Sequence, residues 1–166
     1  LLLSGMSLAD EPVAKVYDAD LAFKKEQGTA TKLSQWTGKK VVMSMIYASC
    51  HGACPLIVKK LKAIQTALEE KQTQASFVLI TFDPKNDTPE KLGGYRKLMG
   101  IEKTNWTLLS GTDNETRKLS MILGIKYSKN AKTGDVMHDN RIVLLNEKGE
   151  VVKNLDGLDS KIEGLF

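Results

Sequence analysis

VVMSMIYASCHGACP, residues 41–55, joins a nearly continuous apolar run to the only two cysteines of this 166-residue chain. The run at residues 41–48 predicts a strand buried on both faces, as in a parallel sheet. Pro55 suits the first turn of a helix, where no backbone N–H is needed. We therefore expect Cys50 and Cys54 where a central strand ends and a helix begins. Ligands bind at such strand ends in open α/β sheets, and a helix N-terminus favours the thiolate.

Helical and strand patterns alternate along the rest of the chain. After the core strand we expect a helix at 55–71, a strand at 76–82, a helix from 89 to about 99, a strand at 106–109, a helix from a capping box at 112–115 to about Gly124, and a strand hairpin at 141–145 and 150–153. This order predicts an α/β protein with a thioredoxin-like fold, in which a central mixed sheet carries helices on both faces.

The remaining segments give weaker signals. Residues 12–40 look like an N-terminal extension, with a small hairpin built from residues 13–17 and 21–23 and a turn at Gly28. Residues 128–140 are polar and predict a loop. Residues 160–166 could start a final helix.

Composition indicates one ordinary globular domain, expected to span residues 10–166. Hydrophobic residues make up 42% and charged residues 27%, and the net charge is +4. No run alternates basic with aromatic residues, which argues against nucleic-acid binding, whereas a mildly basic surface suits an acidic partner protein. No stretch of this chain is long enough to span a membrane.

The first residues carry a compartment signal. Small residues at the first and third positions of Ser7-Leu8-Ala9 resemble a signal-peptidase site, so residues 1–9 are expected to be a signal-peptide remnant. A frayed or vector-derived terminus is the alternative. Export would place the protein in the bacterial periplasm, where its two cysteines could form a disulfide.

The cysteines and one histidine form a candidate metal site. At spacing i, i+4, Cys50 and Cys54 lie on one face of a helical turn and can hold one metal ion or close a disulfide; two buried structural cysteines are the alternative. Thioredoxin-type reductases place a proline before the strand that faces their cysteines, but residues 131–140 contain no proline and present His138 there. Two thiolates and one imidazole suit Cu(I), and also accept Cu(II) or Zn(II).

Three blocks together resemble the Sco/SenC family of copper-binding thioredoxin-fold proteins. They are YASCHGACP at 47–55, ITFDPKNDTPEKL at 80–92 and HDNRIVLLNEKGEVV at 138–152. The resemblance covers roughly residues 21–153. It implies that Cys50, Cys54 and His138 are copper ligands. It also implies delivery of copper to subunit II of cytochrome c oxidase, or reduction of the cysteines at that subunit's copper site.

The sequence departs from this family in places. His51 stands where members often have proline, and it could be a fourth ligand, tune the thiols or face solvent. Asp139 follows the histidine, where it could orient the imidazole or be solvated. Members are usually tethered by a transmembrane helix, whereas the apparent signal-peptidase site in this sequence suggests a free periplasmic protein.

Other residues near these motifs are weaker candidates. Asp83, at the end of the neighbouring strand, is expected either to tune the metal site from outside the ligand set or to form a turn ahead of Pro84. Asp87 fits local turn and capping chemistry. Met137 has a soft sulfur, but neighbouring residues in a strand point apart.

Two functions fit these residues. The first is a copper metallochaperone, which is not an enzyme. The second is a thiol–disulfide oxidoreductase in which Cys50 attacks and Cys54 resolves the mixed disulfide. A peroxidase of the same broad fold fits less well, because residues 47–50 lack the proline and threonine usual ahead of its reactive cysteine.

Overall fold

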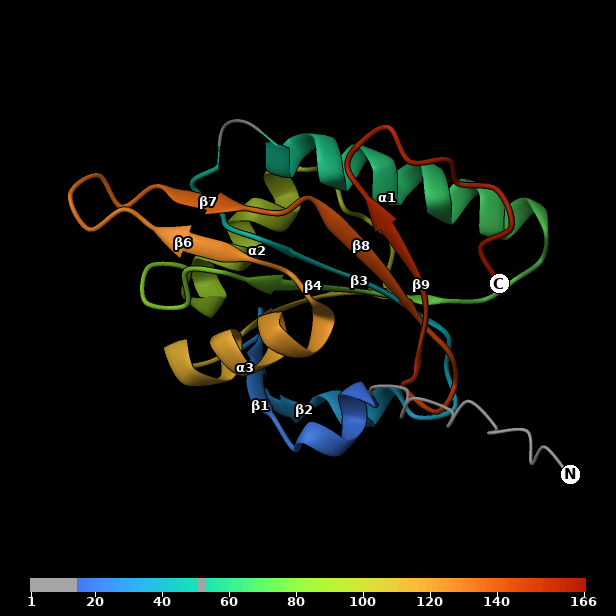
Figure 1. The fold of residues 1–166 in the computed structure, drawn as a ribbon, viewed down its shortest axis with the longest axis horizontal. Coiled ribbons are helices and arrows are strands. Elements are labelled where there is room, and N and C mark those ends of the chain that lie inside the picture. Colours follow the sequence, from blue (N-terminus) through green and yellow to red (C-terminus); the bar gives the residue numbers. More distant parts are fainter. Residues whose placement is uncertain (1–14, 51–52) are drawn as a thin grey trace, which may run out of the picture.

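A seven-stranded mixed sheet forms the centre of the molecule (Figure 1). The computed structural model describes residues 15–50 and 53–166. The strands lie in the order β2 (Ala30–Lys32), β1 (Ala22–Lys25), β5 (Trp106–Ser110), β4 (Ser76–Thr81), β3 (Val41–Ile46), β8 (Arg141–Leu145) and β9 (Val151–Asp156). Strands β3, β4 and β5 run parallel, whereas β8 and β1 join them antiparallel. The predicted mixed sheet is confirmed.

Helices cover both faces of this sheet, as predicted. Side chains alternate across β3: Val42 and Ile46 pack with α1 (Ala53–Glu70) and α2 (Pro89–Leu98), whereas Met43 and Met45 pack on the other face with α3 (Asp113–Leu123). Figure 1 shows α1 and α3 on opposite sides of the sheet. Because β3 is covered on both faces, all six of its residues are buried.

Helices α2 and α3 begin at the capping residues that the sequence predicts. The Thr88 side chain accepts a hydrogen bond from the Lys91 amide, and Pro89 opens α2. Thr112 and Glu115 form the expected capping box of α3. Helix α3 ends at Gly124, whose φ of 65° suits a residue without a Cβ.

Three local predictions are wrong. The N-terminal hairpin pairs β1 with β2, and residues Val16–Ala19 form a 3₁₀ helix, η1, instead of a strand; a second one, η2, spans Leu33–Trp36. The predicted loop at 128–140 contains an antiparallel ribbon of β6 (Tyr127–Lys129) and β7 (Val136–His138). Residues 160–166 form no helix, and the Lys153 amine donates there to the Glu163 and Gly164 carbonyls.

The ribbon of β6 and β7 projects beyond the end of the main sheet (Figure 1). No helix within residues 15–50 and 53–166 combines the length and apolar character needed to cross a bilayer. The predicted signal remnant at residues 1–9 lies outside the described residues, and so does His51.

Candidate metal centre

The two cysteines lie at the junction of β3 and α1, as the sequence predicts. A turn follows β3, in which the Cys50 amide donates a hydrogen bond to the Tyr47 carbonyl at 3.1 Å. The Cys54 amide, in the first turn of α1, donates to Cys50 Sγ at 3.4 Å. Both cysteines are buried. The turn after β3 and the first turn of α1 therefore bring the two sulfur atoms close together.

His138 completes the group from β7, more than eighty residues away in the sequence. Its Nε2 atom lies 3.6 Å from Cys54 Sγ. The two sulfur atoms and one imidazole nitrogen all lie within 4.8 Å of one another. Within the described residues, these three side chains form the group of histidine, cysteine and carboxylate side chains close enough to share a metal ion.

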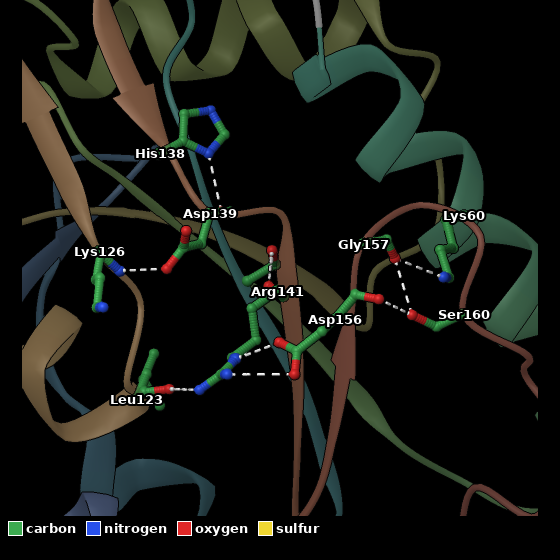
Figure 2. A network of polar contacts seen from close by, with 10 residues as sticks. Lys60, Leu123, Lys126, His138, Asp139, Arg141, Asp156, Gly157 and Ser160 are labelled. Atoms are coloured by element: carbon green, nitrogen blue, oxygen red, sulfur yellow. Dashed lines mark hydrogen bonds and ion pairs between the residues drawn. The ribbon is translucent and has the colours of Figure 1, made fainter.

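Backbone and ring contacts orient the imidazole. The Nδ1–H group donates to the Asp139 carbonyl at 3.0 Å (Figure 2), so the neutral ring carries its lone pair on Nε2, which faces Cys54. The ring also packs against Phe82, with centroids 4.7 Å apart. In the neutral ring, Nε2 thus presents to the cysteines the lone pair that binds a metal.

The Asp139 carboxylate does not orient the imidazole. It accepts a hydrogen bond from the Lys126 amide at 2.9 Å (Figure 2), and the Asp139 amide donates to the Lys126 carbonyl at 2.9 Å. These two bonds close the base of the ribbon. Asp139 therefore fixes the strand that carries His138, and only its carbonyl touches the ring.

Asp83 also acts through the ribbon, and it is absent from the three-residue ligand group. Its buried carboxylate pairs with the Lys129 amine of β6 and accepts from the Asn86 side chain at 2.9 Å. Burial opposes the charged form, but these two hydrogen bonds outweigh it and lower the pKa of Asp83. Asp83 thus anchors the outer strand of the ribbon to the end of β4.

Asp87 has a larger role than the local capping expected of it. Its buried carboxylate accepts from the Ala48 amide at 2.8 Å and from the Thr81 hydroxyl at 2.6 Å. The Lys91 amine lies 3.4 Å from the other carboxylate oxygen and donates to the Ser49 hydroxyl at 3.0 Å. Asp87 and Lys91 therefore hold the turn before Cys50, through contacts that no local pattern signals.

Met137 lies on β7 between two residues that face the body of the protein. Its side chain is 76% exposed, whereas Val136 is buried and His138 half-buried. The alternation of a strand thus directs its sulfur away from the cysteines.

Burial governs the chemistry of Cys54, the more deeply buried of the two cysteines. Desolvation, followed by the neighbouring Cys50, raises the pKa of the Cys54 thiol well above its usual range, although a hydrogen bond from the Tyr47 amide acts in the opposite direction. A bound cation would replace that thiol proton and compensate the thiolate charge.

The donor set and its spacing fit a soft metal ion. Bonds of about 2.3 Å to sulfur and about 2.0 Å to nitrogen place neighbouring ligand atoms about 3.5–4 Å apart. The separation of 3.6 Å between Cys54 Sγ and His138 Nε2 matches that range. Thiolate ligands favour Cu(I), and the imidazole also suits Cu(II).

Comparisons with known proteins agree with the fold. A SCO2-like protein of Rickettsia typhi is 28% identical over 120 residues, which are 68% of this chain and 58% of that protein, so the chain spans little more than half of that relative. The crystal structure of a SCO1/SenC family lipoprotein of Bacillus anthracis superposes with a TM-score of 0.80, at 24% identity, and covers 92% of both chains. Arabidopsis thaliana ScoI, solved with copper bound, has a TM-score of 0.76 at 20% identity, covering 87% of this chain and 90% of that one.

At these identities the two solved structures show the shared fold. The family itself is shown by the sequence: the family model described as SCO1/SenC matches residues 9–165, nearly the whole chain. The order of the motifs and the meeting of two cysteines with a distal histidine agree with that match. The chain belongs to the SCO1/SenC family.

Proposed function

We propose that this protein is a metallochaperone that holds one copper ion through Cys50, Cys54 and His138 and passes it to a partner copper protein. The observation that carries the proposal is the convergence of two sulfur atoms and the lone pair of an oriented imidazole, all within 4.8 Å. Copper bound to the structurally similar Arabidopsis ScoI supports the choice of metal.

Three ligands suit a carrier better than a permanent metal site. Structural metal sites are closed by four protein ligands, whereas an open position admits an incoming ligand. A ligand of the acceptor can enter that position before the carrier's own ligands leave. Following the family resemblance, the proposed acceptor is subunit II of cytochrome c oxidase. We place the protein in the periplasm, and the similar Bacillus lipoprotein supports export.

Competitive titration tests the copper site. The fully reduced protein is titrated with Cu(I) and with Cu(II) against a competing chelator, beside the variant that carries both Cys50→Ala and Cys54→Ala. We expect tight 1:1 binding that the double variant loses. His138→Ala should weaken Cu(II) chiefly, because two thiolates satisfy Cu(I). Tight stoichiometric binding retained in the double variant would refute the site.

Two further measurements test whether the bound copper is transferred to a partner and whether it orders the ribbon. Transfer is followed by mixing the copper-loaded protein with the purified copper-free domain of oxidase subunit II and measuring copper in each after separation. Hydrogen exchange across residues 128–140 should slow on adding copper, because metal binding tethers the ribbon to α1. Retention of all copper by the carrier would argue against delivery.

Thiol–disulfide exchange is the second candidate function. The Cys54 amide lies 3.4 Å from Cys50 Sγ, so the two cysteines are already neighbours. Cys50 would attack a partner disulfide, releasing one partner thiol; Cys54 would then displace the second, leaving a Cys50–Cys54 disulfide and a reduced partner. This reaction does not need the imidazole. Wild-type rates of disulfide reduction in His138→Ala, with no copper affinity in the parent protein, would favour it.

A further inference from the structure

Phe82 packs against both strands of the ribbon at once. The centroid of its ring lies 4.7 Å from that of the His138 ring on β7, and the two planes meet at 32°. On β6, the centroid of the Tyr127 ring lies 4.9 Å away, with planes at 40°. Tyr127 and His138 are direct cross-strand partners in the ribbon. Aromatic pairs attract each other at centroid distances of about 4.5–7 Å, so one ring holds a candidate ligand and its cross-strand partner together.

The main sheet fixes the position of Phe82. The residue directly follows β4, and its amide donates a hydrogen bond at 2.7 Å to the carbonyl of Ile46, the last residue of β3. Its side chain is only 3% exposed. The next residue, Asp83, pairs with Lys129 of β6. Because the two central strands hold its backbone, the Phe82 ring is a fixed support on which the ribbon rests.

The ribbon needs such a support from outside. Strands β6 and β7 form a separate two-stranded sheet, and each strand is three residues long. A two-stranded hairpin is at best marginally stable in water. Tyr47 meets the imidazole of His138 edge-on, with centroids 6.0 Å apart and planes at 87°. Phe82 lies closer and more nearly parallel to the imidazole, so it limits the tilt of that ring more directly.

We propose that Phe82 is the positioning residue of the metal centre: its ring holds the His138 imidazole toward the cysteines and thereby sets the affinity for Cu(II) relative to Cu(I). This proposal rests on the copper site proposed above, and it names a residue outside the ligand set that decides how well the third ligand serves. Two thiolates satisfy Cu(I), whereas Cu(II) depends more on the imidazole. A loosened imidazole therefore costs more Cu(II) affinity than Cu(I) affinity.

The first test uses metal-free protein and hydrogen exchange. Phe82→Leu keeps a buried apolar side chain but removes the ring. The Lys126 and Asp139 amides, which close the base of the ribbon, should then exchange about five-fold faster through local opening.

Phe77→Leu is the matched control for this test. Phe77 is a buried residue near the other end of β4, about 16 Å along the strand from Phe82. Its ring stacks on Trp106, also with centroids 4.7 Å apart, so its loss removes a similar contact far from the ribbon. Wild-type exchange of the two amides in Phe82→Leu, or the same acceleration in Phe77→Leu, would overturn the proposal.

The second test measures Cu(II) and Cu(I) affinity in a double-variant cycle. Phe82→Leu should weaken Cu(II) binding about ten-fold, as loss of a partner that orients a ligand does, and leave Cu(I) binding nearly unchanged. Phe77→Leu should alter neither affinity. In a His138→Ala background, Phe82→Leu should cause no further loss of Cu(II) affinity, because its ring acts through the imidazole.

The cycle distinguishes positioning of the ligand from general support of the fold. Wild-type Cu(II) affinity in Phe82→Leu, equal weakening of Cu(II) and Cu(I), or a loss of Cu(II) affinity that persists in the His138→Ala background would each contradict the proposed role. A parent protein that binds no copper would refute the metallochaperone instead, and the exchange test would then decide whether Phe82 positions the ribbon.

Discussion

Asp87→Ala should destabilise the protein far more than removal of an ordinary surface carboxylate. The substitution leaves the Ala48 amide and the Thr81 hydroxyl without their acceptor, and both bonds are short, at 2.8 and 2.6 Å. Hydrogen bonds to a charged group contribute about 1.5–3 kcal/mol each. The Lys91 partner is 42% exposed in its side chain, so that ion pair adds at most about 1 kcal/mol. We expect a loss of about 3–5 kcal/mol in the free energy of unfolding.

Urea unfolding measures this loss through the buried tryptophans, Trp36 and Trp106. In a domain of this size the expected loss lowers Tm by about 10 °C. Asp87→Asn keeps an acceptor oxygen and should cost about 1–2 kcal/mol. Asp135→Ala, at an exposed carboxylate, should stay within about 0.5 kcal/mol of the parent protein. A loss below about 1 kcal/mol in Asp87→Ala would refute the idea that this carboxylate holds the turn before Cys50.

Three other outcomes are expected. The pKa of Asp83 is lower in the folded protein than its ordinary value of 3.8, so its ionised form stabilises the fold fully above that value and the stabilisation is lost as pH falls through the lower folded pKa. The difference in unfolding free energy between the parent protein and Asp83→Asn should therefore shrink below about pH 4. Urea unfolding measures this difference. Iodoacetamide should modify Cys50 well before Cys54 in the reduced, metal-free protein, because Cys54 is fully buried and the pKa of its thiol is raised. Mass spectrometry measures the labelling of each cysteine, and equal labelling would contradict this expectation. Gly149→Ala should lower Tm clearly, because the φ of 78° is strained for alanine and the added Cβ would lie 2.3 Å from the Tyr17 ring. An unchanged Tm would show that the Tyr17 ring moves aside at little cost.

Local patterns predicted much of the fold and the members of the candidate site. The continuous apolar run of β3, the capping box at Thr112 and the alternation of strands and helices act within a few residues of sequence, so they can be read without coordinates. The placement of Cys50 and Cys54 after β3 follows from the same local logic. His138 was found through its position before a strand that had to lie beside the cysteines in a thioredoxin-like fold.

The failed predictions share a cause. The segment that forms β6 and β7 resembles a loop in sequence because each strand is only three residues long, and contacts with residues elsewhere in the chain hold the ribbon in place. Lys129 reaches Asp83, and the His138 ring packs against Tyr47 and Phe82. The C-terminal segment likewise makes contacts that its own sequence does not signal, since the Lys153 amine of β9 donates to the Glu163 and Gly164 carbonyls.

The sequence by itself determined which side chains carry the chemistry and where along the chain the strands and helices lie, because residue type, spacing and capping act locally. Only the tertiary structure decided what holds that chemistry in place. Asp87 binds the amide of Ala48, and the Tyr47 ring packs edge-on against His138 of β7. Contacts between residues so far apart in the sequence depend on how strands and helices pack, and no short stretch of sequence contains the packing of the whole chain.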